Sequence, residues 1–165
     1  MNNCKSFKPS IDNNSKILIL GSMPGVKSLE EQQYYAHPQN RFWKVMGAIC
    51  NESELYGFDY NMKLQTLLKN KIALWDTLKS CKRDGSLDSD IQNETPNDIR
   101  KLLKKYPNIQ IICLNGNKSY SAFKKYFPDL SGKLSCNKMP STSPANARYS
   151  LDTLINEWSE VIKQC

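Results

Sequence analysis

The sequence contains one histidine, no closely spaced cysteine pair and no phosphate-binding glycine loop. His37 is the single imidazole, and the six cysteines are scattered singly between Cys4 and Cys165. Structural zinc and iron–sulfur sites draw on clustered ligands, so we expect no metal and no cofactor. Isolated thiols are typical of a reducing compartment, where cysteine serves as a small apolar residue.

The chain also lacks any segment typical of a signal peptide or a membrane span. Its N-terminus is polar, and no apolar run reaches the roughly 20 residues that cross a bilayer. Together with the scattered thiols, this predicts a cytoplasmic protein with no membrane partner. The length of 165 residues fits one domain over 1–165, which can bury a core unaided. We expect this domain to be a monomer.

Basic residues outnumber acidic ones. The chain has 23 Lys and Arg against 16 Asp and Glu, a formal net charge of +7. A basic surface favours polyanionic partners because it releases counterions from a phosphate backbone. Many basic proteins bind no nucleic acid, so the net charge is compatible with a nucleic-acid partner but does not by itself indicate one.

Short apolar runs alternate with helical patterns, which is typical of β–α units on a parallel sheet. The patterns predict strands at 16–20, 71–75, 109–114 and 133–139, and helices at 41–50, 62–69, 96–105, 117–127 and 151–163. Thr95 is expected to cap the third helix, with Pro96 at its first position. The predicted fold class is α/β, a three-layer α/β/α sandwich with a central four-stranded parallel sheet.

Ligands of such sheets bind outside the carboxyl ends of the strands, so the loops that follow the strands are the candidate site. These loops are 21–40, 76–90, 115–118 and 140–148. The first begins with Gly-Ser-Met-Pro-Gly, which by itself indicates a tight turn. We expect the second to be an irregular polar loop that forms one wall of the pocket.

Residues 34–43 (YYAHPQNRFW) gather aromatic rings, an imidazole, two amides and a guanidinium just before a helix. Rings can stack on a base, amides can bind its edge or hold a water, and a guanidinium can meet a phosphate. Phe42 and Trp43 begin the apolar pattern of the helix, so we expect them in the core. His37 and Asn40 have structural alternatives, as a loop residue bonded to main chain and as a helix N-cap.

Three segments together resemble the uracil-DNA glycosylase superfamily. The segments 21–25 (GSMPG), 36–45 (AHPQNRFWKV) and 140–145 (PSTSPA) look most like its hypoxanthine-DNA (deoxyinosine) glycosylase branch. The similarity runs from about Ile17 to the final helix. It implies a four-stranded parallel sheet between helices. It also implies an enzyme that flips a damaged base from DNA and hydrolyses its N-glycosidic bond.

The resemblance implies residue roles as well. Uracil-removing branches carry a polar Asp or Asn where this chain has Met23, whose thioether cannot position water. In the deoxyinosine branch an asparagine that matches Asn40 takes that role, and its carbonyl can orient the attacking water. Asn115 matches a position associated with base binding. Ser141 stands where uracil-specific relatives often have a histidine that stabilises the departing base.

We therefore expect Asn40 to be the catalytic residue. Base binding is assigned to Gly21, Ser22, Met23, Asp76 and Asn115. DNA binding is assigned to Arg41, Ser141, Thr142, Ser143, Pro144, Ala145 and Arg148, with Lys27 and Lys138 as further candidate phosphate contacts. No lysine matches a Schiff-base nucleophile, so we expect a monofunctional enzyme without β-lyase activity. The lack of clustered ligands predicts that it also works without a metal.

The leading hypothesis is a hydrolase that removes hypoxanthine from deoxyinosine in damaged DNA. A uracil or G:U/G:T mismatch glycosylase is the alternative within this class, because purine and uracil pockets can differ by few side chains. A catalytically silent DNA-binding module stays open because Met23 and Ser141 depart from the uracil-removing pattern. A hydrolase of free nucleosides is a further alternative.

Overall fold

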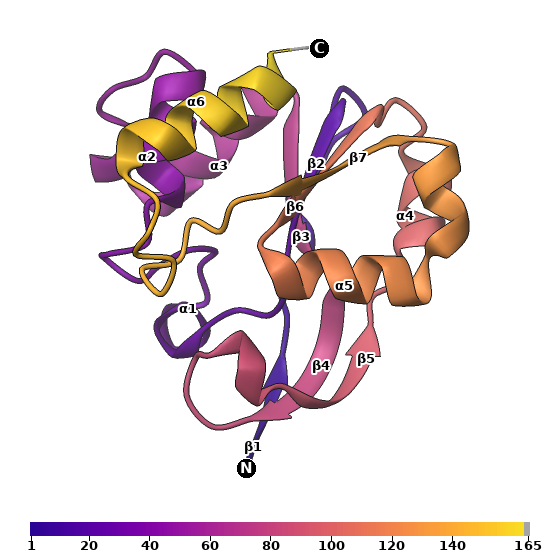
Figure 1. The fold of residues 1–165 in the computed structure, drawn as a ribbon. Coiled ribbons are helices and arrows are strands. Elements are labelled where there is room, and N and C mark those ends of the chain that lie inside the picture. The colour runs from indigo at the N-terminus through magenta and orange to yellow at the C-terminus, as the bar shows by residue number, and fades with distance from the viewer. Residues whose placement is uncertain (164–165) are drawn as a thin grey trace.

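Four parallel strands form the centre of the computed structural model, which describes residues 1–163 (Figure 1). In spatial order they are β3 (Ile72–Asp76), β2 (Ile17–Gly21), β6 (Ile111–Asn115) and β7 (Ser135–Met139). Every pairing between neighbours in this sheet is parallel. The sheet confirms the four strands and the fold class predicted from the apolar runs.

Helices cover both faces of this sheet (Figure 1). One face carries α2 (Phe42–Ile49), α3 (Tyr60–Lys69) and α6 (Leu151–Ile162), and the other carries α4 (Ile99–Lys105) and α5 (Asn117–Tyr126). Strand β2 therefore reads as a continuous apolar run, with Ile17 and Ile19 in one core cluster and Leu18 and Leu20 in the other. This two-sided burial confirms the three-layer prediction.

Helix α2 carries the aromatic pair that the sequence assigned to the core. Phe42 and Trp43 are 0% and 2% exposed, which confirms that assignment. The Phe42 ring meets Trp158 of α6 edge-on, with centroids 6.5 Å apart. This contact joins α2 to α6 and fixes the direction in which the chain enters α2.

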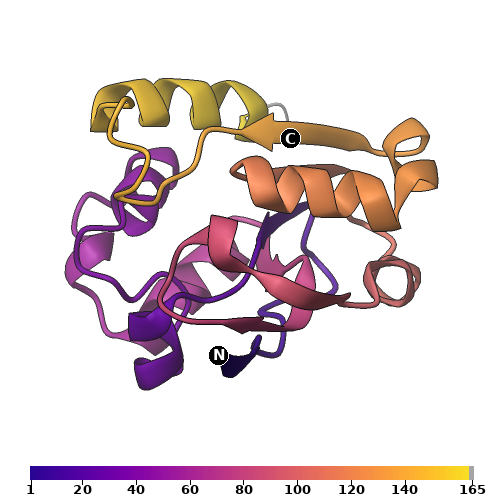
Figure 2. The same cartoon turned by 60° about the horizontal axis from the view of Figure 1, so that its bottom comes forward.

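A second sheet, absent from the sequence prediction, lies at the bottom of the molecule in Figure 1 and comes forward in Figure 2. Its antiparallel strands are β1 (Asn2–Lys5), β4 (Leu78–Arg83) and β5 (Gln92–Pro96), in the order β1-β4-β5. The expectation of an irregular loop over 76–90 is therefore wrong for residues 78–83. The β4 sequence LKSCKR buries positions 78, 81 and 83 and exposes Lys79 and Lys82, a spacing that does not follow the period of two by which a strand is recognised.

The predicted start of the third helix is also wrong. Thr95 and Pro96 end β5, where Pro96 pairs with Leu78 at the edge of the small sheet. An edge position tolerates proline because its missing N–H is not needed by a further strand. Helix α4 begins at Ile99 instead, and the Asp98 side chain caps it by accepting from Lys101 N at 3.1 Å.

The long loop after β2 contains a short helix, α1 (Val26–Glu31), which the sequence prediction missed. Three 3₁₀ turns complete the elements: η1 (Leu55–Gly57), η2 (Asp88–Asp90) and η3 (Pro128–Gly132). No helix within residues 1–163 is long and apolar enough to cross a membrane. Five cysteines in that range are free thiols, and Cys165 lies outside the described residues.

Candidate active site

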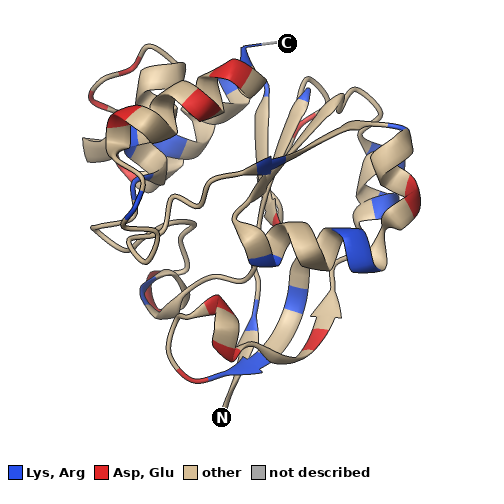
Figure 3. Cartoon of the chain, in the orientation of Figure 1, with Lys and Arg blue, Asp and Glu red and all other residues tan. Residues whose placement is uncertain are grey.

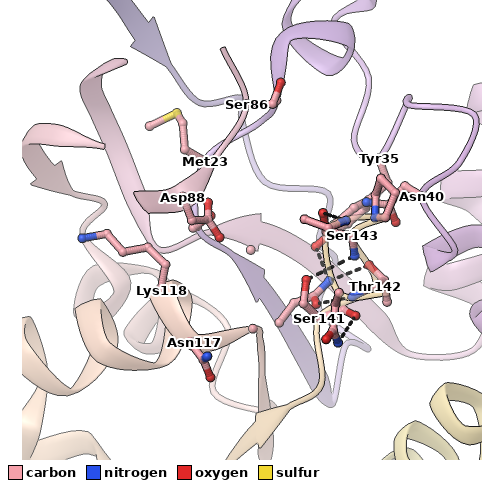
Figure 4. A pocket seen from close by; sticks show the side chains of 18 of the residues that line it. Met23, Tyr35, Asn40, Ser86, Asp88, Asn117, Lys118, Ser141, Thr142 and Ser143 are labelled. Carbon is pink, nitrogen blue, oxygen red and sulfur yellow. Dashed lines mark hydrogen bonds between the residues drawn. The ribbon is translucent and has the colours of Figure 1, made fainter. Parts of the chain in front are cut away.

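A cleft of about 1210 Å³ opens at the carboxyl ends of the central strands. Its walls come from the loop after β2, the turn after β4, the start of α5 and the loop after β7 (Figure 4). It brings together most of the residues assigned to the site from the sequence: Gly21, Ser22, Met23, Asn40, Asp76, Asn115, Ser141, Thr142, Ser143, Pro144, Ala145 and Arg148. The candidate phosphate contacts Lys27 and Lys138 line it as well.

Asn40 stands in the cleft wall directly before α2. Its Oδ1 atom accepts from Phe42 N at 2.9 Å, so it satisfies the first amide of the helix. The backbone N–H of Asn40 donates to His37 O at 2.9 Å. Asn40 thus serves the helix start and faces the cleft at once, and its carbonyl keeps a second lone pair for a water. His37 is exposed, and its Nδ1 accepts from Gln39 N at 3.1 Å.

Met23 is buried although it belongs to the glycine-rich loop that lines the cleft. It is 6% exposed and packs in an apolar cluster with Cys4, Leu78, Cys81 and Ala122. This cluster joins the loop after β2 to the small sheet and to α5. A thioether held there offers the cleft neither a donor nor a strong acceptor.

Asn115 is tied to the loop after β7 rather than left open. Its Oδ1 accepts from Thr142 N at 3.1 Å, and its Nδ2 donates to Thr142 Oγ1 at 3.1 Å. The same Nδ2 donates to the Tyr35 hydroxyl at 3.3 Å. Most of the hydrogen-bonding capacity of this amide is therefore taken up by the protein.

Gly116, which follows Asn115, has a φ of +93°, a conformation that L side chains rarely adopt. A Cβ there would also come within 3.2 Å of Ser141 Cβ. Glycine is required at this position so that the strand end and the loop after β7 can approach each other.

Arg41 was expected to contact a DNA phosphate, but its side chain hydrogen-bonds to the protein instead. Its Nη2 donates to Ser143 O at 2.9 Å and to Asn146 O at 3.0 Å, and its Nη1 donates to Tyr149 O. The guanidinium is thus turned inward, with Nη1 and Nη2 donating to main-chain oxygens. In this structure Arg41 holds the loop that carries the other assigned DNA-binding residues, and we propose this role for it in place of a phosphate contact.

The loop after β7 is ordered by its own hydrogen bonds as well. Ser143 N donates to Ser141 Oγ at 3.1 Å, and Asn146 Nδ2 donates to Ser141 O at 3.0 Å. Pro144 and Ala145 remain exposed at its tip. A rigid loop with a small, exposed tip has the shape needed to enter a DNA groove.

Asp76 ends β3 and is 4% exposed. Burial raises the pKa of its carboxyl to about 7, Asp88 adds to the rise, and Arg83 opposes it. The Oδ2 atom of Asp76 has no hydrogen-bond partner in the protein. A neutral carboxylic acid is therefore available in this wall of the cleft at and below neutral pH.

Three further cleft residues were not singled out by sequence reasoning. Tyr35 has a φ of 55° and stacks on Phe42 with centroids 3.9 Å apart. Asp88 accepts from Ser22 Oγ at 2.6 Å, and Lys118 forms an ion pair with Glu94. Figure 4 shows Tyr35 and Asn40 beside the loop after β7, and Met23 and Asp88 across from them. Aromatic enrichment in 34–43 hinted at Tyr35, whereas the other two depend on how the small sheet folds back.

Basic residues around the cleft differ in how free their charges are. Lys27 pairs with Glu31 at 3.0 Å, and the Lys138 ammonium lies 5.3 Å from the Tyr120 ring centroid. Arg148 is exposed in the loop after β7. Figure 3 shows further basic segments on α5 and on the small sheet, and acidic segments on α6. Within residues 1–163, no group of three or more His, Cys, Asp or Glu side chains is placed to hold a metal.

The family model of the uracil DNA glycosylase superfamily matches residues 9–162. A protein of Methanosarcina barkeri (strain Fusaro) called hypoxanthine DNA glycosylase is 38% identical over 160 residues, covering 97% of this chain and 98% of the relative. A protein of the same name from Methanosarcina acetivorans is 39% identical over 160 residues, with 96% and 98% covered.

A solved structure shares the fold over its whole length. The solution NMR structure of a putative uracil DNA glycosylase from Methanosarcina acetivorans superimposes with a TM-score of 0.85 at 38% identity. The match covers 99% of this chain and 98% of that one. The likeness therefore includes the cleft and all of its walls.

Proposed function

The chain belongs to the uracil DNA glycosylase superfamily, and we propose that it removes hypoxanthine from DNA by hydrolysing the bond between base and deoxyribose. It is a DNA repair glycosylase that acts on deaminated bases. Relatives at 38% and 39% identity over nearly the full chain carry the name hypoxanthine DNA glycosylase, and this observation carries the choice of base. The reaction consumes one water and releases the free base.

The substrate enters the cleft as a flipped nucleotide. Flipping costs a few kcal/mol and costs least at a mismatched or damaged pair, which favours lesions over normal bases. The exposed tip at Pro144 and Ala145 enters the groove and fills the space that the flipped base leaves. Hydrogen bonds that join this loop to Asn115 and Arg41 order it before DNA binds, so binding costs less conformational entropy.

Asn40 positions the attacking water. An amide is a poor base, so the transition state has oxocarbenium character and the water is oriented rather than deprotonated. Met23 supports this assignment, because its thioether supplies no polar group at the position where uracil-removing branches carry Asp or Asn. The proposed contacts to DNA phosphates are Arg148, Lys138 and Lys27, all at the cleft.

We propose that the enzyme is monofunctional and works without a metal or cofactor, as a cytoplasmic monomer. A Schiff-base mechanism needs a free amine near the sugar. Three lysines line the cleft: Lys118 is in an ion pair with Glu94, Lys27 is in an ion pair with Glu31, and the Lys138 ammonium lies over the Tyr120 ring. Borohydride therefore traps no covalent adduct between this protein and abasic DNA.

The test uses duplexes that carry one deoxyinosine or one deoxyuridine, incubated with the protein and a chelator. Excision is measured as alkali-labile sites under single-turnover conditions. The expected result is strand breakage at deoxyinosine, reduced at least a hundredfold in Asn40→Ala, on the order of the effect of losing a catalytic positioning group. Gln39→Ala is the matched control, since it removes an exposed amide one residue away that does not line the cleft.

Three other results would change the assignment. Strand breakage at deoxyuridine alone would leave the family assignment unchanged and would make uracil the base that is removed. Tight, salt-sensitive binding without breakage at either base indicates a DNA-binding module. Full activity of Asn40→Ala removes Asn40 from the mechanism, provided that its melting temperature matches that of the wild type.

A further inference from the structure

The Asp76 carboxyl is a buried polar group with an unused oxygen inside the cleft. Within residues 1–163, Asp76 is the one cleft-lining residue with a buried side-chain oxygen or nitrogen that lacks a partner. Leaving such a group unpaired costs stability, on the order of 1–3 kcal/mol. We therefore expect bound substrate to supply the hydrogen-bond partner that the protein does not.

Gly21 of β2 makes room for this carboxyl. The two residues are register partners at the ends of neighbouring strands. A Cβ on residue 21 would lie 2.6 Å from Asp76 Oδ1 and 3.2 Å from the Tyr35 hydroxyl. The absence of a side chain at position 21 therefore lets the carboxyl and the phenol converge over the end of β2, at the floor of the cleft.

The neighbouring candidate for base recognition is already engaged. Both ends of the Asn115 amide bind protein groups, in Thr142 and Tyr35. A flipped base in this cleft would have to break those bonds to use that amide fully. The Asp76 Oδ2 atom has no such bond to give up, because it has no hydrogen-bond partner in the protein.

The charges around Asp76 determine its protonation state. The titratable and charged groups that act on it are Asp88 from η2, Arg83 from β4, Tyr34 and Tyr35 from the loop after α1, and Tyr60 from α3. Arg83 is itself buried, and its guanidinium donates to Pro24 O rather than to a carboxylate. Burial and Asp88 together outweigh its positive charge, so the carboxyl is neutral in mildly acidic solution.

We propose that Asp76, as a neutral carboxylic acid, pairs with the N–H/C=O edge of the flipped base. This inference rests on the proposed glycosylase function. In hypoxanthine the N1–H donates to the carboxyl C=O, and the carboxyl O–H donates to O6. Uracil presents the same pair of groups at N3–H and O4, so one side chain serves both deaminated bases. The O–H donor also stabilises negative charge that builds on O6 as the base departs.

Ionised Asp76 loses that donor and repels the departing base. Excision should therefore fall as the pH rises past the pKa of this carboxyl. Between about pH 6 and pH 8 the neutral fraction of an acid titrating near 7 drops about tenfold. Asp76→Asn keeps a donor and an acceptor at the same place but cannot ionise, so its profile should be flat over this range.

The first experiment measures single-turnover excision of deoxyinosine at several pH values between about 6 and 8. Wild type is expected to lose about tenfold, Asp76→Asn to change little, and Asp76→Ala to be slower throughout. Asp88→Asn removes the neighbouring negative charge that raises the pKa of Asp76, so the loss should begin at lower pH in that variant. Equal slopes for wild type and Asp76→Asn would overturn the proposal.

The second experiment separates this inference from the proposed function. Binding of free hypoxanthine is followed by NMR chemical shifts at pH 6 and pH 8, for wild type and Asp76→Asn. Weaker wild-type binding at pH 8, absent in the variant, supports the role of Asp76 even if no duplex is cleaved. Binding that is equal at both pH values in wild type, or no binding at pH 6, overturns it.

Discussion

Asn115 Oδ1 accepts a hydrogen bond from the backbone N–H of Thr142 at 3.1 Å, which fastens the end of β6 to the loop after β7. Thr142 is 1% exposed, so its N–H has no access to water. This bond gives Asn115 a structural role besides any contact with the base. It also connects the floor of the cleft to the segment proposed to enter DNA.

Asn115→Ala should lower the free energy of unfolding by about 1–3 kcal/mol, because it leaves a buried N–H unpaired. Thr142→Val removes only the hydroxyl contact and should cost less. Urea denaturation checks both, with an unchanged m-value. If Asn115→Ala is as stable as wild type yet inactive, its amide acts on the base and not on the loop.

Arg41→Lys should weaken the loop after β7 without changing the salt dependence of DNA binding. A lysine ammonium cannot meet three main-chain oxygens in the way that the planar guanidinium does. We expect a loss of about 2 kcal/mol in unfolding free energy and slower excision. The slope of log Kd against log salt, measured on a deoxyinosine duplex, should stay as in wild type.

Arg148→Ala is the matched control for that measurement. Arg148 is exposed, and its proposed role is a phosphate contact. Its removal should reduce the salt slope by about 0.9 and leave unfolding unchanged. A reduced slope in Arg41→Lys instead would restore Arg41 as a phosphate contact.

The central sheet could be predicted from the sequence because its strands are buried on both faces. A run such as that of β2 has no polar position to interrupt it. The small sheet could not, because the buried residues of β4 are unevenly spaced and because it pairs with β1, some 80 positions away in the chain. Thr95 and Pro96 fit a helix start locally, but pairing with Ser80 and Leu78 of β4 places them in a strand.

The site was predictable to the level of loops and not to the level of atoms. The rule that ligands bind at the carboxyl ends of parallel strands located the cleft walls. It could not predict that the Arg41 side chain points inward, because its hydrogen-bond partners lie more than 100 residues away along the chain. Nor could it reveal the burial of the Asp76 carboxyl, because that depends on Gly21 and on the folding back of the small sheet.

Gly21→Ala should damage both stability and excision. The new Cβ would lie 2.6 Å from Asp76 Oδ1, and the sheet backbone cannot move away. We expect a loss of about 1–3 kcal/mol in unfolding free energy, as for overpacking. Gly57→Ala is the control, since nothing lies within 4 Å of a Cβ there. Asp76→Ala in the Gly21→Ala background should recover stability, and failure to recover would place the clash elsewhere.

Asp76→Asn should stabilise the protein in a pH-dependent way. The folded-state pKa of Asp76 is raised from 3.8 to about 7, so the folded chain holds this proton more tightly than the unfolded chain. The resulting stability is fully present below pH 4 and is lost as the pH rises to about 7. A rise of about 3 units corresponds to at most about 4 kcal/mol.

Asn does not ionise, so the variant keeps its stability over the same interval. The difference in unfolding free energy between variant and wild type should therefore grow from about pH 4 to pH 7 and then level off. Urea denaturation at pH 4.5, 6 and 8 measures it. A constant difference would mean that Asp76 titrates normally in the folded chain. The fall in excision with rising pH would then have to come from another group.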